Sequence, residues 1–307
     1  APRAFSMKLA QVTKAICRLL PTSVDGELVA KHVQGVLVAL MSKHVDDLKA
    51  TGDKSHVDHI MAEIGKIFGE LKVEYHNFTN CGVRHTQDPT TKEVTLDQTE
   101  YIKALKPIVH SELTSHSEAE CSMELQALYM SLLGAACYCL MTRVDAAVYL
   151  TALQRRTQKA QVIHVKRLNA VVRWLQRDAR QLAYRRFNGK QTELLLVSDA
   201  AFKKEADEGH ALKGGLYLRV DLDGFKYPTK LHNLEISSDK PKRMVCHIID
   251  YACKQQRHVT RSTFAAELFA ACDAMDHGLL LAIMLHQVLT GSVTVSTARE
   301  LREFGGW

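Results

Sequence analysis

The sequence lacks the CxxC pairs from which many zinc sites are built. Its 307 residues include eight cysteines, which are scattered along the chain, and none forms a CxxC pair. No paired His/Cys spacing is typical of a zinc site either. We therefore exclude a cysteine-ligated zinc site and expect buried, reduced thiols in an intracellular protein.

Long apolar runs, internal repeats and low-complexity segments are also missing. No stretch approaches the ~20 uninterrupted apolar residues of a membrane-spanning helix, so we expect no membrane partner. Hydrophobic content of 46% and charged content of 24% are ordinary for a globular protein, and 307 residues can bury a core in two or three domains. No secretion signal is found, so we expect a cytoplasmic protein, with the nucleus as the alternative.

Patterns along the chain predict strands and helices together, then helices alone, then strands with one helix. The first third predicts a helix at 5–20, a strand hairpin at 26–45, a helix at 54–68, and two strands joined by a turn at Asp88-Pro89. A polar segment, 106–122, is the best candidate for a linker. From Leu125 to about Tyr184 the chain is predicted to be entirely helical. One apolar stripe steps through it by three and four: Val165, Leu168, Val172, Leu175, Ala179 and Leu182.

The last third predicts three strands, within "LLLVSDAAF", "GGLYLRVDLDGF" and "RMVCHIIDYACKQQ". A helix is predicted to follow them from about Ser262 to Leu289.

Acidic residues are almost missing between Gln154 and Arg186, where ten Lys/Arg stand against the single Asp178. A solvated helix usually mixes both signs, whereas a one-signed basic helix suits a phosphate backbone, because each contact releases counterions. We interpret the stretch as a nucleic-acid-binding surface; the alternative is a merely solvated basic face. Trp174 lies near the apolar stripe, so we expect it to pack rather than to stack on a base. The assigned binding residues are Arg155, Arg156, Lys159, Lys166, Arg167, Arg173, Arg177 and Arg180.

Two groups of acids are candidate metal ligands. Asp46 and Asp47 follow the apolar run "VQGVLVALM"; such a pair is usually a solvated turn, but carboxylates are also the ligands that Mg²⁺ prefers. The second group is Asp199, inside an apolar predicted strand, and Glu267, on an otherwise apolar helix face. A carboxylate within such a strand is costly unless a cation or hydrogen bonds compensate it, whereas a lone Glu on a helix can simply reach solvent.

Six segments, in the same order, resemble the polyprotein of copia-type LTR retrotransposons. "APRAF" followed by "KHVDDLKATGD" resembles the reverse transcriptase palm, in which a V-D-D turn is followed by a strand ending near Gly-Asp. "VTLDQTEYIKAL", "LYMSLLGAACYCLMTRVDAAVYLTALQ" and "HVKRLNAVVRWLQ" resemble the segments that come next in the family. "LVSDAAF" and "RSTFAAELFAA" resemble its ribonuclease H domain. Each segment alone is weak evidence for this family, but the six together, in the right order, are strong evidence and cover nearly the whole chain.

The resemblance implies a fold that combines α+β and α/β parts. These are a partial reverse transcriptase palm over 1–110, a linker with a basic helical thumb or connection over 111–187, and an incomplete ribonuclease H-like domain over 188–307. It implies a nucleic-acid partner, either an RNA–DNA hybrid or a primer–template duplex, which would lie on the basic helices.

The resemblance also assigns the acids. Asp46 and Asp47 correspond to catalytic polymerase aspartates, and Asp199 and Glu267 to the first two ribonuclease H carboxylates. All four would bind the cofactor, Mg²⁺ or Mn²⁺, for nucleotidyl transfer and for hydrolysis of hybrids.

This chain departs from the family in ways that leave its enzymatic activity open. The third polymerase aspartate would lie upstream of "APRAF". The third ribonuclease H carboxylate would follow the Glu267 helix, where only Glu300 and Glu303 occur beyond Asp276. Val144 replaces a family proline, and the second acid of the S-D-A-D segment is missing. We therefore expect a fragment truncated at both ends, short of one carboxylate in each site and inactive alone.

Two other classes of function stay open. The chain could be a decayed or domesticated remnant that binds nucleic acid without catalysis, or a protein-interaction scaffold that kept only the fold. Steep salt dependence without metal-dependent turnover would indicate the first. Affinity for hybrids no better than that of any basic protein would indicate the second. The sequence leaves oligomeric state, template preference and host open.

Overall fold

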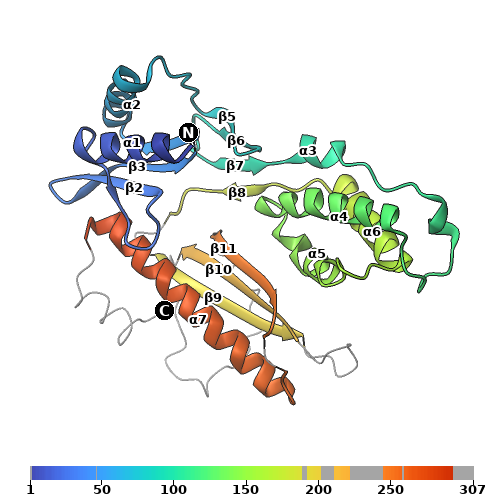
Figure 1. The fold of residues 1–307 in the computed structure, drawn as a ribbon. Helices are drawn as coiled ribbons and strands as arrows, with labels where there is room; N and C mark the ends of the chain where they lie inside the picture. Colours follow the sequence, from blue (N-terminus) through green and yellow to red (C-terminus); the bar gives the residue numbers. More distant parts are fainter. Residues whose placement is uncertain are drawn as a thin grey trace. The chain divides into compact units, whose positions relative to one another are not determined.

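The computed structural model describes residues 2–45, 47–188, 192–201, 211–221, 245–257 and 259–292. Helices and antiparallel sheets combine in them, which confirms the expected α+β mixture (Figure 1). The chain divides into two compact units: unit 1 is Ala1–Tyr75 with Met275–Trp307, and unit 2 is His76–Ala274. The division into a palm, a helical part and a ribonuclease H-like domain stays a prediction.

Unit 1 is a four-stranded antiparallel sheet, in the order β1-β2-β3-β4, with helices packed on it. Leu9, Val29, Met41, Ile60 and Ile64 share its buried core. The predicted helices and hairpins form, although the first helix ends at Ala15 rather than near residue 20. Its elements are α1 (Pro2–Ala15), β1 (Leu20–Pro21), β2 (Leu28–Val33), β3 (Val36–His44), β4 (Asp47–Gly52), α2 (Lys54–Phe68) and the last part of α7 (Thr263–Thr290).

Unit 2 begins with a second antiparallel sheet and a group of helices. The sheet has the order β5-β6-β7-β8 and consists of β5 (Asn77–Asn80), β6 (Val83–Gln87), β7 (Val94–Asp97) and β8 (Leu182–Tyr184). The helices are α3 (Thr99–Ala104), α4 (Met123–Tyr138), α5 (Ala147–Gln154) and α6 (Val162–Arg177), with short 3-10 turns η1 (Ser111–Thr114), η2 (Cys139–Met141) and η3 (Val144–Ala146).

A third antiparallel sheet completes unit 2, together with the first part of α7. Its order is β11-β10-β9, and its strands are β9 (Thr192–Ala201), β10 (Leu212–Asp221) and β11 (Cys246–Gln255). These strands and α7 confirm the elements expected for the last third of the chain. Ala200 and Ala211 pack against Ala266 and Ala270, so α7 lies against the face of β9 that carries Ala200.

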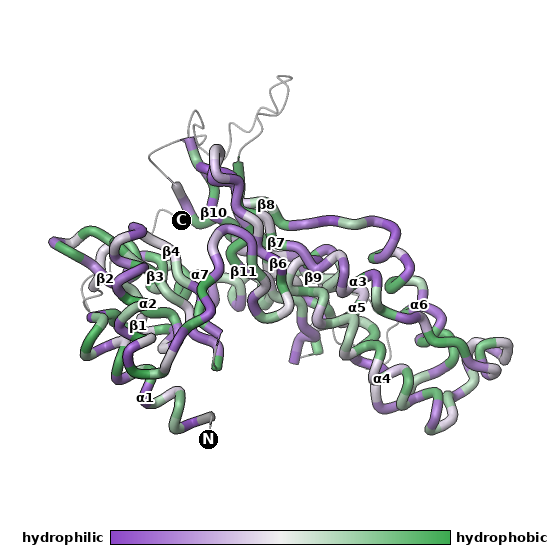
Figure 2. The backbone as a smooth tube through the Cα atoms, turned by 90° about the horizontal axis from the view of Figure 1, so that it is seen from above, coloured by the Kyte–Doolittle hydropathy of each residue, from purple (hydrophilic) through white to green (hydrophobic). Residues whose placement is uncertain are grey.

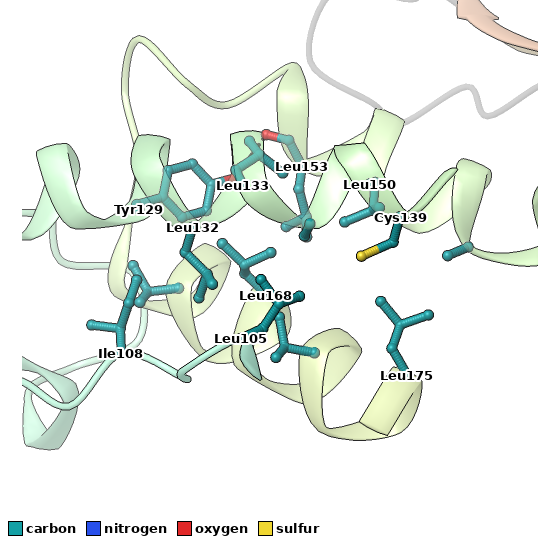
Figure 3. Close-up of a cluster of buried hydrophobic side chains, with 14 of the residues drawn as sticks. Leu105, Ile108, Tyr129, Leu132, Leu133, Cys139, Leu150, Leu153, Leu168 and Leu175 are labelled. Atoms are coloured by element: carbon teal, nitrogen blue, oxygen red, sulfur yellow. Dashed lines mark hydrogen bonds between the residues drawn. The ribbon is translucent and has the colours of Figure 1, made fainter. Parts of the chain in front are cut away.

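The helical core of unit 2 forms where the apolar stripe of α6 meets α4 and α5. Leu168 and Leu175 from α6 lie among side chains of the other helices, including Tyr129 and Leu150 (Figure 3). The Tyr129 hydroxyl donates to the Leu153 carbonyl at 2.7 Å, so the buried phenol is satisfied. The stripe is confirmed as far as Leu175, where the helix is about to end.

The predicted linker at 106–122 is bound to α6 rather than free. The side chain of Asn169 accepts from the Ile108 amide and donates to the Ile108 carbonyl, both at 2.8 Å. Backbone hydrogen bonds join Val162 to Ala119 and Ile163 to Ser117. The polar composition of the segment indicated a linker, but its backbone groups find partners on a neighbouring helix. It is therefore part of the packed unit.

Helix α6 ends at a buried arginine, not at Leu182 as the apolar stripe predicted. Arg143 is fully buried, and it donates to the carbonyls of Leu175, at 3.3 Å, and Asp178, at 2.7 Å. Its other nitrogens bind both carboxylate oxygens of Asp145, at 2.9 and 3.0 Å. The guanidinium satisfies carbonyls that a helix end leaves without partners, and Asp145 balances its charge. The chain then leaves the helix, so Leu182–Tyr184 forms strand β8.

Two helices are long and apolar enough to cross a membrane by length and composition, Met123–Met141 and Thr263–Thr290. The first contains α4, whose Leu125, Tyr129 and Leu133 lie in the core of unit 2. Length and composition alone are weak grounds for a membrane span, since core helices pass the same test. The expected absence of a membrane partner stays a prediction.

Replacing Arg143 by Met should destabilise unit 2 by about 2–3 kcal/mol, because two carbonyls at the end of α6 would lose their buried donor, and Asp145 would keep only the exposed Arg180. Arg180→Gln is the matched control, since Arg180 is exposed and bonds the same region from solvent. Urea unfolding followed by circular dichroism measures both variants. Equal midpoints for the two variants would contradict a structural role for Arg143.

Candidate nucleic-acid interface

Apolar and polar residues follow one another along α6 (Figure 2). Their helical spacing gives the helix a buried face and a basic face. Val165, Leu168, Val172 and Leu175 are buried against the core. The helix begins with a capping box, in which Gln161 and His164 satisfy each other's backbone amides. Packing on one side and a cap at the start fix which side chains point outward.

Lys166, Arg173 and Arg177 lie on the outward face of α6, with Arg167 beside them. Steps of seven and four residues return to the same side of a helix, so the three cations form a stripe. The stripe is about 16 Å long at a rise of 1.5 Å per residue. Over that length a nucleic-acid duplex of B-form charge density carries about nine phosphate charges. The stripe is therefore opposite in charge to a phosphate backbone, and it is long enough to reach several phosphates.

More positive charge gathers at the first turn of α6. The pKa of His164 lies below its ordinary value, first because the ring is buried and then because Arg156 and Arg167 place positive charges near it. The ring Nδ1 accepts a hydrogen bond from the Gln161 amide at 3.0 Å, which requires the unprotonated nitrogen. His164 is therefore a neutral structural residue between two cations rather than part of a binding surface.

Most of the eight predicted binding residues have no acidic partner in the described part of the chain. Arg180 pairs with Asp178 at 2.8 Å and with Asp145 at 3.5 Å, and Arg156 also has an interaction partner. Lys166 also makes a contact of 3.4 Å with the Ser117 hydroxyl, which leaves its charge uncompensated. No ion pair to an acid is found among the described residues for Arg155, Lys159, Arg167, Arg173 and Arg177.

Trp174 packs against the helical core, as expected, and is partly buried there. The Arg143 guanidinium lies 5.0 Å from its ring centroid, and Tyr149 meets it edge to face at 5.8 Å. An indole held between a buried cation and another ring cannot turn outward without breaking both contacts.

The paired aspartates fall in the β3–β4 hairpin. Asp47 is the first residue of β4, exposed, and its partner in the antiparallel ladder is His44. Asp46 lies outside the described residues. Strand β4 ends at Gly52, where φ is +147° and an added Cβ would lie 2.2 Å from the Val38 carbonyl oxygen. The hairpin thus has the order of elements that the resemblance implied.

The structure places Asp199 and Glu267 on neighbouring elements but does not bring them to one side. Asp199 is exposed on β9, so it carries none of the burial cost that its apolar neighbours suggested. Ala200 faces α7, and successive residues of a strand alternate between faces, so Asp199 points away from that helix. Glu267 is half-buried on α7, next to Ala266.

The described residues do not fit a Mg²⁺ or Mn²⁺ centre. Within the ranges that the structure describes, no group of three or more His, Cys, Asp or Glu residues is arranged to hold a metal ion. Glu300 and Glu303 lie outside those ranges. A two-metal site needs several convergent carboxylates, and Asp199 and Glu267 do not converge. We therefore derive no catalytic step through a metal from this arrangement.

Three polar residues that hold α6 in place were missed from the sequence: His164, Asn169 and Arg143. The first two interrupt an otherwise apolar side of the helix, and a polar residue on a buried face needs a partner. That interruption was a readable signal, although it did not reveal the partners. Arg143 gave no such signal, because its carbonyl partners are distant in sequence.

The stability of unit 2 should fall as the pH drops below about 6.5, because the folded pKa of His164 lies below that ordinary value. The unfolded chain then binds a proton that the folded ring resists, so stability is full above 6.5 and is lost on acidification. His164→Gln should flatten this dependence. His247, whose pKa is lowered in the same direction, contributes equally to both proteins. Urea unfolding midpoints measured between pH 5 and 8 test this pH dependence, with the exposed His59→Gln variant as the control. Parallel curves for the wild type and both variants would contradict a role for His164.

Comparisons of the chain with protein-family models, with curated proteins and with solved structures find no match. The resemblance to copia-type reverse transcriptases therefore stays a prediction from the sequence. What the chain does has to be argued from the geometry of its described residues.

Proposed function

We propose that this chain binds nucleic acid through the basic face of α6, as part of a retrotransposon reverse transcriptase with ribonuclease H. The observation that carries the proposal is the division of α6 into two faces. Its apolar face is fixed in a packed core, and its outward face holds Lys166, Arg173 and Arg177, with no acid of the described chain to neutralise the two arginines.

The preferred ligand is a duplex, namely an RNA–DNA hybrid or a primer–template. A stripe about 16 Å long reaches several phosphates of a continuous backbone, and contacts to phosphate carry no sequence information. An A-form duplex is recognised mostly by its shape and backbone. Binding should therefore depend on salt and on duplex geometry rather than on sequence.

The reverse transcriptase part of the proposal rests on the order of elements. Asp47 of the V-D-D segment begins β4 in a β-hairpin, and β4 ends at Gly52. Three antiparallel strands then precede α7, with Asp199 in the first strand and Glu267 on the helix, as the resemblance requires. In the full protein, nucleotidyl transfer and hydrolysis of hybrids would need carboxylates beyond these.

A second candidate function is a nucleic-acid-binding remnant without catalysis. The observation that favours it is the placement of Asp199, which points away from α7 while Glu267 lies on that helix. Both candidates share the basic face of α6 and differ only in whether a carboxylate site is completed. Binding and cleavage therefore need separate experiments.

The variant Lys166→Gln/Arg173→Gln/Arg177→Gln should bind an RNA–DNA hybrid about ten-fold more weakly or worse at low salt, because it removes the stripe. The slope of log K against log salt should shrink by about 0.9 for each lost phosphate contact. Fluorescence anisotropy with a labelled hybrid at several salt concentrations measures both.

The matched control is Lys54→Gln/Lys66→Gln/Lys72→Gln, which removes the same charge from lysines that pair with acids in unit 1. Equal losses in the two triple variants would mean that net charge alone drives binding. The basic face would then have no special part in it.

The 307-residue chain should not cleave the RNA strand of an end-labelled hybrid in Mg²⁺, and Asp199→Asn should behave identically, because the described carboxylates do not converge. The hybrid should still be retained on both proteins at low salt. Cleavage that Asp199→Asn abolishes would show that another acid completes the site. The remnant hypothesis would then be excluded.

A further inference from the structure

Unit 1 contains a cavity whose charged lining residues, within the described part of the chain, are cations. It has a volume of about 500 Å³ and lies between the end of α1, strands β1 and β2, and the end of α7. Lys14 and Arg18 line it, with His32 beside them, and Leu20 and Ala30 supply an apolar wall. The remaining lining residues are Thr290, Gly291 and Ser292. Among the residues that the structure describes, no carboxylate lines this space, so the charge of its described lining is of one sign.

Four acids of unit 1 pair with lysines away from the cavity. Within the described chain, Glu27 pairs with Lys43, Asp58 with Lys54, Glu63 with Lys66 and Glu74 with Lys72. No ion pair is found there for the two cavity cations, Lys14 and Arg18. Two like charges beside a partly enclosed space repel each other and favour an anion between them.

The wall opposite these cations is held in place by hydrogen bonds from α7. The His32 Nε2 lies 2.9 Å from the Val288 carbonyl, which can only accept, so this nitrogen carries the proton. The side-chain oxygen of Gln287 accepts from both the amide and the hydroxyl of Ser23. Gly291 has a φ of +83°, and an added Cβ would lie 3.1 Å from the His32 ring. The cavity is therefore shaped by specific contacts rather than by a loose chain end.

We propose that this cavity binds the phosphate group of a phosphate monoester. A guanidinium offers a planar pair of donors, and an ammonium offers a point charge. Together they suit a phosphate dianion as ligand better than they suit a singly charged carboxylate. A volume of about 500 Å³ exceeds what one phosphate needs, so the organic part of the ester lies against Leu20 and Ala30. The ester is either a free nucleotide-sized molecule or the phosphorylated end of a nucleic acid. The site shares no residue with α6, so it stands independently of the proposed function.

Adenosine 5′-monophosphate is the probe. Its binding to the chain is measured by calorimetry and by the line width of its ³¹P signal. The wild-type chain should bind it, and adenosine without phosphate should bind at least about ten-fold more weakly, because the charge-assisted contacts are lost. Lys14→Gln/Arg18→Gln should weaken binding to a similar extent. Arg3→Gln, an exposed change on the same helix, should leave binding unchanged.

Three results would overturn the proposal: an unperturbed ³¹P signal with the wild-type chain, equal affinity for adenosine, or equal weakening by Arg3→Gln. The first two use the native protein, so they hold even where the double variant fails to fold. A 5′-phosphorylated oligonucleotide, tested on the chain with the α6 stripe neutralised, separates the two sources. Binding of the oligonucleotide alone would assign the cavity to nucleic-acid ends, and binding of the nucleotide would assign it to a small ester.

Discussion

The contact of buried Arg143 with half-buried Asp145 is the one on which the arrangement of unit 2 depends. The guanidinium is fully buried and makes four hydrogen bonds, two to the carboxylate and two to carbonyls at the end of α6. A buried charge survives only when it is paired and its donors are satisfied. The same contact ends the helix, turns the chain toward β8 and brings a cation against Trp174. One interaction thereby fixes both the length of α6 and the direction of the chain after it.

The polar residues on the inner side of α6 all have structural partners, and this separates them from the outer cations. His164 caps the first turn, Asn169 binds the backbone of Ile108, and Arg143 meets the last turn. A rotation of α6 about its axis would break all three contacts at once. The packing therefore fixes which face of the helix the outer cations leave from.

Much of the fold could be predicted from periodicity, because buried faces impose it. The stripe Val165, Leu168, Val172 and Leu175 indicated both the helix and its buried side. The boundaries and the polar contacts could not be predicted, because they depend on residues far apart in sequence. Leu182 continues the helical spacing, yet it lies in a strand, since Arg143 captures the carbonyls that would continue the helix. The segment 106–122 shows the same limit, because composition does not say which helix will satisfy its amides.

The basic face of α6 and the carboxylate site differ in how far each can be predicted from the sequence. A basic face needs only charge on one side of a helix, and residue spacing is enough to predict it. A carboxylate site needs two side chains to point into the same space, and that depends on which face of a strand the helix covers. In β9 the small residue Ala200 admits close packing of Ala266 and Ala270, so α7 takes that face. Asp199, one position earlier, is then directed to the other side by the alternation of the strand. Binding in this chain is therefore supported by its geometry, whereas catalysis requires groups that the described residues do not supply.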